Sequence, residues 1–148
     1  MLDKNELGQY VDLLSELEDL RIRIRVTEGK IAELQTMQTA DSVTHGKKGK
    51  KPLKRTVIRG VPVREIEQKM HMLRAYRIRL KAAEIRAGEM VMEIQEYING
   101  IEDSRIRRLF TYRYVDKLTW AQVAVKMGGN HTADSCRMTV ERYLDEKK

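Results

Sequence analysis

Apolar residues recur at alternating steps of three and four along the first 37 positions of the chain. The positions with this spacing are Tyr10, Leu13, Leu17, Leu20, Ile24, Thr27, Ile31 and Leu34. Seven of the eight are apolar when the tyrosine is counted, and such spacing is typical of a coiled-coil seam. Gly29 costs a helix about 1 kcal/mol relative to alanine, but the seam continues beyond it. The pattern predicts a coiled-coil segment over residues 1–37.

The same spacing returns over residues 63–100. Its positions are Ile66, Lys69, Leu73, Tyr76, Leu80, Ala83, Ala87, Met90, Ile94, Tyr97 and Ile101, with Lys69 the polar exception. Pro62 suits the first turn of a helix, and Asn99-Gly100 suits its end. Each helix would be roughly 50 Å long. We therefore expect an all-α fold that begins with a long antiparallel helical hairpin; a coiled-coil dimer built from the same seams is the alternative.

Residues 101–148 carry three short helical patterns instead of one long seam. Asp103 or Ser104 is placed to cap the first helix, whose apolar face comprises Ile106, Leu109, Phe110 and Tyr114. After a turn at Asp116-Lys117, Thr119 caps a second helix over 120–127, which ends at Gly128-Gly129. Thr132 caps the third. Helix, glycine turn and helix predict a compact helix-turn-helix domain.

In a helix-turn-helix, the second helix of the pair enters the major groove of DNA. The residues placed to contact base edges are Asn130, His131, Thr132, Asp134, Ser135, Arg137 and Met138, and those placed to contact phosphates are Lys126 and Arg142. Arg137 is the leading candidate because a guanidinium can bind guanine or phosphate in a bidentate manner. Its alternative is an ion pair with Glu141, one helical turn further on.

Three further residues have both a structural and a functional interpretation. Trp120 is interpreted as a core residue in preference to a base-stacking one, because it begins an apolar face. Cys136 is interpreted as a small buried hydrophobe in preference to a redox thiol. For His131, a phosphate contact and a solvated turn residue both remain open.

Residues 38–62 form a connection much longer than a helical hairpin needs. Its basic residues are Lys47, Lys48, Lys50, Lys51, Lys54, Arg55 and Arg59. A flexible basic arm that contacts the DNA backbone and a solvated disordered loop are both open interpretations. The stretch HGKKGKK lacks the spacing of a phosphate-binding loop and follows no predicted strand, so nucleotide binding is not expected there.

Charge and composition narrow the function further. The formal net charge of +7 is made up of −3 over residues 1–37, +6 over 38–62, +1 over 63–100 and +3 over 101–148. One cysteine and three scattered histidines give no disulfide framework and no metal-ligand spacing. Neither a catalytic constellation nor a membrane-length apolar run or signal peptide is visible. We expect a cytoplasmic protein that is not an enzyme and takes no cofactor or metal.

The segment RYVDKLTWAQVAVKMGG, followed by TADSCRMTVERYL, resembles the C-terminal half of the RinA and ArpU-like phage transcriptional regulators. That family is similar to the fourth region of bacterial sigma factors and includes related prophage proteins. The matching features are Arg113-Tyr114, Thr119-Trp120, Val123-Ala124 and the capping Thr132. The stretches DSVTHGKKGKKP and VIRGVP are similar to the linker of the prophage proteins, although this linker is unusually rich in lysine. The resemblance implies a sigma-like helix-turn-helix that binds DNA.

These observations predict a phage or prophage transcriptional regulator of the bacterial cytoplasm. Its partners would be double-stranded DNA, RNA polymerase as a second contact, and a second copy of the chain through the helical stalk. Two alternatives stay open. One is a phage DNA-packaging subunit of the small-terminase type, and the other is a helical interaction module that binds no DNA.

Overall fold

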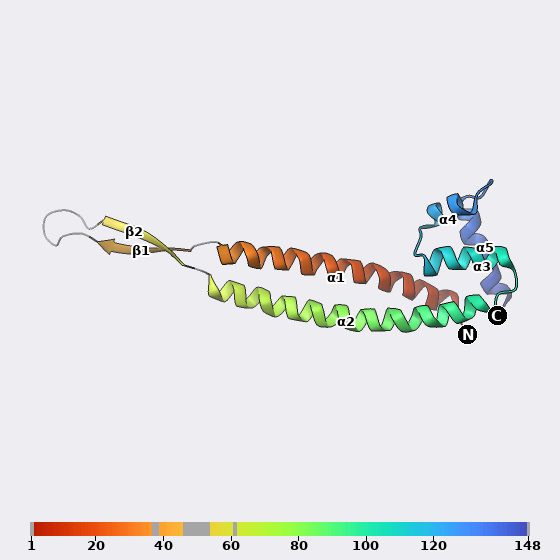
Figure 1. Ribbon diagram of the computed structural model, residues 1–148, viewed down its shortest axis with the longest axis horizontal. Helices are drawn as coiled ribbons and strands as arrows, with labels where there is room; N and C mark the ends of the chain where they lie inside the picture. The colour runs from red at the N-terminus through yellow and green to blue at the C-terminus, as the bar shows by residue number, and fades with distance from the viewer. Residues whose placement is uncertain (1, 37–38, 46–53, 61, 148) are drawn as a thin grey trace. The chain divides into compact units, whose positions relative to one another are not determined.

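The computed structural model describes residues 2–36, 39–45, 54–60 and 62–147 (Figure 1). The elements in chain order are α1 (Lys4–Thr36), β1 (Thr39–His45), β2 (Lys54–Gly60), α2 (Val63–Asn99), α3 (Ser104–Phe110), the π-helix η1 (Thr111–Val115), α4 (Trp120–Met127) and α5 (Ala133–Glu146). They form two compact units. One unit comprises Met1–Leu17 with Ala82–Lys148, and the other is Glu18–Lys81.

Apart from strands β1 and β2, the predicted all-α fold is confirmed, with α1 packed on α2 as an antiparallel hairpin (Figure 1). Each unit contains part of both helices, and the predicted seam residues are those that the pairing covers. In the Glu18–Lys81 unit, Leu20, Ile31 and Leu73 are buried. An ion pair also joins the two helices there, with the Arg77 guanidinium 2.6 Å from Glu28 Oε1. The seams therefore pair within one chain, which leaves other helix faces for any contact between chains.

Over the described residues 39–45 and 54–60, the structure corrects the expectation of a flexible or disordered linker. Strands β1 and β2 pair as an antiparallel hairpin, with Thr39 opposite Gly60 and His45 opposite Lys54. The sequence of β2 contains the β-branched run Thr56-Val57-Ile58, and such residues favour extended backbone. This signal was obscured by the lysine-rich composition around it. Lys54 and Arg55 thus belong to a strand.

The predicted caps of the C-terminal helices are confirmed. A carboxylate oxygen of Asp103 accepts hydrogen bonds from the backbone N–H groups of Arg105 and Ile106, at 2.7 and 3.1 Å. The Thr119 hydroxyl accepts from the backbone of Gln122, whose side chain accepts in return from the Thr119 N–H. Such reciprocal bonds satisfy donors that a helix N-terminus leaves unpaired. As a result, α4 begins at Trp120 and ends at Met127, as predicted.

The core of the first unit is organised around Phe110, which has no exposed surface. The rings of Tyr97, Tyr114 and Tyr143 surround it, with centroids at 5.8, 5.7 and 5.9 Å. Tyr97 belongs to α2, while the other two tyrosines come from η1 and α5. This cluster joins the end of α2 to the C-terminal helices through apolar contacts, which are the main source of stability in such a core.

Helix α3 continues directly into the π-helix η1, which the sequence pattern did not predict. The backbone N–H of Asp116 donates to the carbonyl of Thr111 at 2.9 Å, five residues earlier. Lys117 then adopts a φ of 58°, a left-handed conformation that costs a non-glycine residue energy. The chain therefore turns sharply after η1. Thr119, the cap of α4, follows two residues after Lys117.

Candidate nucleic-acid interface

Helices α4 and α5 form the predicted helix-turn-helix. They pack against each other, with Val123 and Ala124 of α4 buried together with Cys136 and Val140 of α5. The turn begins at Gly128 and Gly129, whose φ values of 74° and 65° lie in the left-handed region. Glycine adopts this region without steric cost, so the chain can reverse immediately after α4. The interpretation of Cys136 as a buried hydrophobe is confirmed, since it is 1% exposed.

The N-terminus of α5 is fixed by a second reciprocal cap. The Thr132 hydroxyl accepts from the backbone N–H of Ser135 at 3.1 Å, and the Ser135 hydroxyl accepts from the Thr132 N–H at 2.9 Å. The Ser135 hydroxyl also donates to the Thr132 carbonyl at 3.0 Å. Both predicted DNA contacts therefore hold the first turn of α5 in place, and their hydroxyls are already engaged in hydrogen bonds.

Most of the predicted DNA contacts lie at the surface. The exposed residues are Lys126, Asn130, Thr132, Asp134, Ser135, Arg137, Met138 and Arg142, whereas His131 is half-buried. Asp134, Met138 and Arg142 follow one another at steps of four and so share one face of α5. Met138 is 45% exposed in spite of its apolar side chain. Apolar side chains at such positions can contact the methyl group of thymine.

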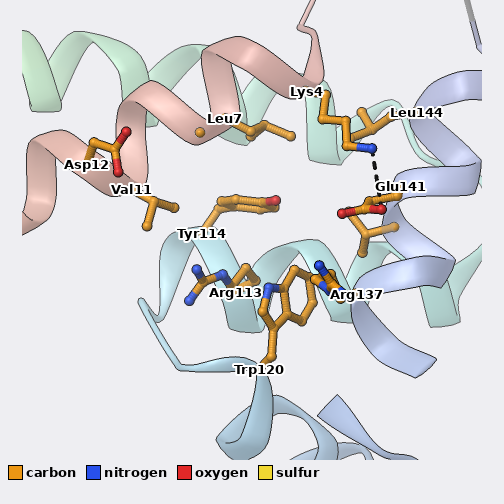
Figure 2. A pocket seen from close by; sticks show the side chains of 12 residues that line it. Lys4, Leu7, Val11, Asp12, Arg113, Tyr114, Trp120, Arg137, Glu141 and Leu144 are labelled. Atoms are coloured by element: carbon orange, nitrogen blue, oxygen red, sulfur yellow. Dashed lines mark ion pairs between the residues drawn. The ribbon is translucent and has the colours of Figure 1, made fainter. Parts of the chain in front are cut away.

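Arg137 lies on a neighbouring face of the same helix. Its guanidinium is 3.5 Å from Asp134 and its side chain is 51% exposed. The predicted alternative, a pair with Glu141, is wrong, because Glu141 pairs with Lys4 at 3.3 Å. Arg137 and Trp120 line the same groove (Figure 2). The long, weakly held side chain of Arg137 is available to a phosphate or a base edge.

A groove of about 230 Å³ separates the start of α1 from the helix-turn-helix (Figure 2). Leu7 and Val11 of α1 form one wall, and Tyr114, Trp120 and Arg137 contribute to the other. Nothing in the sequence pattern assigns Lys4 and Leu7 to this domain. Leu7 lies three residues before Tyr10, next to the seam but outside its alternating steps, and its place in the groove depends on contacts with distant parts of the chain.

Trp120 is only half-buried, which corrects its interpretation as a core residue. One face of its indole ring lies under the Arg113 guanidinium, 5.1 Å from the ring centroid. A hydrogen bond also holds Arg113 in place, because its guanidinium donates to the carbonyl oxygen of Leu118 at 2.8 Å. The tryptophan therefore supports the start of α4 from the edge of the core.

Tyr114 lines the same groove and is almost fully buried. Burial raises the pKa of its hydroxyl to about 12, against an ordinary value of 10.0. The nearby Arg113 lowers this pKa and Glu141 raises it, but both act less strongly than burial. Tyr114 is thus neutral at physiological pH and serves the packing of the domain.

Lys126 is exposed but has local partners. Its ammonium lies 3.3 Å from an Asp116 carboxylate oxygen and 4.4 Å from the ring centroid of Tyr112. Arg108 approaches the same ring, at 5.5 Å, and its Nε donates to the Tyr112 hydroxyl at 3.2 Å. Two cations therefore converge on Tyr112 at the surface of the domain, with Asp116 offsetting one charge.

Of the predicted backbone contacts in the linker, Lys47, Lys48, Lys50 and Lys51 lie outside the described residues. Lys54 and Arg55 are described as part of β2, opposite His45 and Thr44 of β1. Both basic residues thus lie at the start of β2.

The described part of the chain also bears on metal binding and on membrane insertion. Within residues 2–36 and 62–147, no group of three or more histidine, cysteine, aspartate or glutamate side chains is placed to hold a metal ion. Over the same residues, no helix combines the length and the apolar character needed to cross a membrane.

No protein-family model, curated protein or solved structure matches this chain.

Proposed function

We propose that this protein is a sequence-specific DNA-binding regulator of transcription, with α5 as the helix that enters the major groove. The observation that carries the proposal is the capped start of α5 after a tight glycine turn. This arrangement leaves Asp134, Arg137, Met138 and Arg142 exposed on the first three turns. Arg137 would contact guanine or phosphate, Met138 a thymine methyl group, and Arg142 the backbone.

The wider assignment follows from the resemblance to the RinA and ArpU-like regulators. On this proposal the protein would act in the cytoplasm of a bacterial host, where the helix-turn-helix would bind an operator and another surface would contact RNA polymerase. The +6 charge of residues 38–62 would add salt-dependent affinity for the DNA backbone. The proposed activity is binding alone, without catalysis, metal or cofactor.

The test is selection of bound sequences from a pool of random duplexes at two salt concentrations. The wild type is compared with Arg137→Ala and with Arg25→Ala, which removes one exposed arginine charge from α1 and serves as the matched control. We expect an enriched motif for the wild type and Arg25→Ala. Loss of a preferred base in Arg137→Ala would identify the base that this side chain contacts, typically at a cost of about 1–3 kcal/mol.

Two outcomes would contradict the proposal. Binding that depends strongly on salt but enriches no motif would favour a packaging role, in which the protein holds DNA without choosing a sequence. Failure of the folded wild type to bind any duplex at low salt would favour an interaction module that binds protein only.

A further inference from the structure

The outer face of α2 carries large apolar side chains where charged ones are expected. Ile78, Ile85 and Met92 are 71%, 54% and 65% exposed, and they follow one another at steps of seven. Each lies five positions after a residue of the buried seam, such as Leu73 or Ala87, and so points away from α1. In a two-helix pair this outermost position is normally polar, because it faces solvent.

Small residues continue the apolar face between these three side chains. We define the outer stripe as Ala75, Ile78, Ala82, Ile85, Gly88 and Met92, all of them exposed on the single helix α2. A Cβ placed on Gly88 would meet nothing within 4 Å, so the glycine is not required by packing within the chain. Small residues beside large ones allow a second helix to approach closely.

The charges of α2 indicate which helix fits this stripe. Residues 63–81 contain six basic and two acidic residues, a net charge of +4, whereas residues 82–99 contain one basic and four acidic residues, a net charge of −3. A second α2 in antiparallel orientation places the basic half of each helix opposite the acidic half of the other. A parallel copy would place like charges together, which is unfavourable.

Ile85 is the natural centre of such a pair. With the two-fold axis at Ile85, residues equally far before and after it lie level across the interface, so Ile78 meets Met92 and Ala82 meets Gly88 of the second copy. The flanking Lys81 lies level with Glu89 of the second copy. Apolar side chains thus meet apolar ones, large residues alternate with small ones, and opposite charges flank them.

We propose that two copies of this chain associate through the outer stripe of α2, antiparallel and with the two-fold axis at Ile85. This dimer deepens the proposed function and rests on it, because a two-fold dimer would offer two DNA-binding domains to two half-sites. Its test uses no DNA, so its failure and the failure of the DNA-binding proposal are separate results.

The first experiment measures mass by sedimentation equilibrium over a range of micromolar concentrations. The wild type is compared with Ile85→Lys and with Ile22→Lys, a matched control at an exposed isoleucine of α1. We expect dimers for the wild type and the control, and monomers with unchanged helical circular dichroism for Ile85→Lys. A wild type that stays monomeric, or an Ile85→Lys variant that stays dimeric, would overturn the proposal.

A charge exchange covers the case in which Ile85→Lys fails to fold. Lys81→Glu places an acidic residue level with Glu89 of the second copy and should raise the dissociation constant several-fold. The double variant Lys81→Glu, Glu89→Lys should recover most of the loss. Equal dissociation constants for the wild type and both variants would overturn the antiparallel arrangement.

Single cysteines determine the orientation directly. Two Ile85→Cys chains should form a disulfide on mild oxidation, because the two-fold axis brings the residue beside its own copy. Ile78→Cys or Met92→Cys should not, since seven residues to each side of the axis separate the two thiols by about 21 Å, well beyond disulfide reach. Equal cross-linking at all three positions would overturn the proposal in favour of a parallel pair. The native Cys136 is 1% exposed and should not react.

Discussion

The guanidinium of Arg113 lies over the indole ring of Trp120, with its central carbon 5.1 Å from the ring centroid. The same arginine donates a hydrogen bond to the carbonyl of Leu118 at 2.8 Å. One side chain thus spans the exit from η1 and the entry to α4. This contact accounts for a tryptophan that is conspicuous in the sequence and yet only half-buried in the fold.

Replacing Arg113 should therefore loosen the junction between η1 and α4. We expect Arg113→Ala to lower the free energy of unfolding by about 1–2 kcal/mol, from loss of the cation–π contact and the hydrogen bond. Urea unfolding monitored by the fluorescence of Trp120, the chain's one tryptophan, measures the effect. Arg105→Ala, at an exposed arginine of α3, is the control. Equal stability of the two variants would contradict the role of Arg113.

The cap of α5 gives a second prediction. Thr132→Ala removes the hydroxyl that accepts from the Ser135 N–H and should destabilise the domain by about 1 kcal/mol. Thr132→Ser keeps the acceptor and should retain most of the stability. Thermal unfolding by circular dichroism compares the two. If Thr132→Ser loses as much as Thr132→Ala, the methyl group and not the cap matters at this position.

The sequence predicts much of this fold because many of its determinants are local. A seam such as that of Leu17 and Leu20 repeats with the period of a helix pair, so periodicity alone identifies the buried side. Thr119 and Thr132 each stand immediately before a helical pattern, and the structure places both at the helix N-termini. Local hydrogen bonds and periodic burial are visible in a single sequence because both act within a few residues.

The remainder depends on contacts between distant parts of the chain. Nothing near Lys4 indicates that its ammonium pairs with Glu141 of α5. The β-hairpin was missed because the lysine-rich composition concealed the short β-branched run of β2. The candidate interface could be predicted from the sequence only in part. Its exposed residues follow from the helical pattern of α5, whereas the neighbouring groove depends on α1.

The raised pKa of Tyr114 predicts how stability depends on pH. The pKa of Tyr114 is about 12 in the folded state, against an ordinary value of 10.0 for tyrosine. The folded state therefore holds the proton more tightly. The stabilising contribution is fully present below pH 10 and is lost as the pH rises from 10 to 12, by up to about 1.4 kcal/mol per pH unit. Urea unfolding in buffers below and above pH 10 measures this loss.

Tyr114→Phe provides the control for this pH dependence. The variant lacks the titrating hydroxyl, so its stability should fall less steeply in the same pH interval. Some dependence should remain, because burial also raises the pKa values of Tyr10 and Tyr97. An identical slope in the wild type and Tyr114→Phe would show that other groups cause the alkaline loss of stability.

The first turns of α1 should contribute to the stability of the helix-turn-helix unit. Leu7 is 1% exposed and faces the groove wall that Leu144 and Val140 of α5 help to form. Leu7→Ala should therefore cost about 2–5 kcal/mol, as is usual for a buried leucine. Lys4→Ala removes only an ion pair between side chains that are 50% and 34% exposed, so it should cost less than about 1 kcal/mol. Hydrogen exchange of the α5 amides separates a local effect from a global one, because Leu7→Ala should accelerate exchange in α5 while Lys4→Ala should not. Equal, small effects of both substitutions would mean that residues 101–148 are stable without α1.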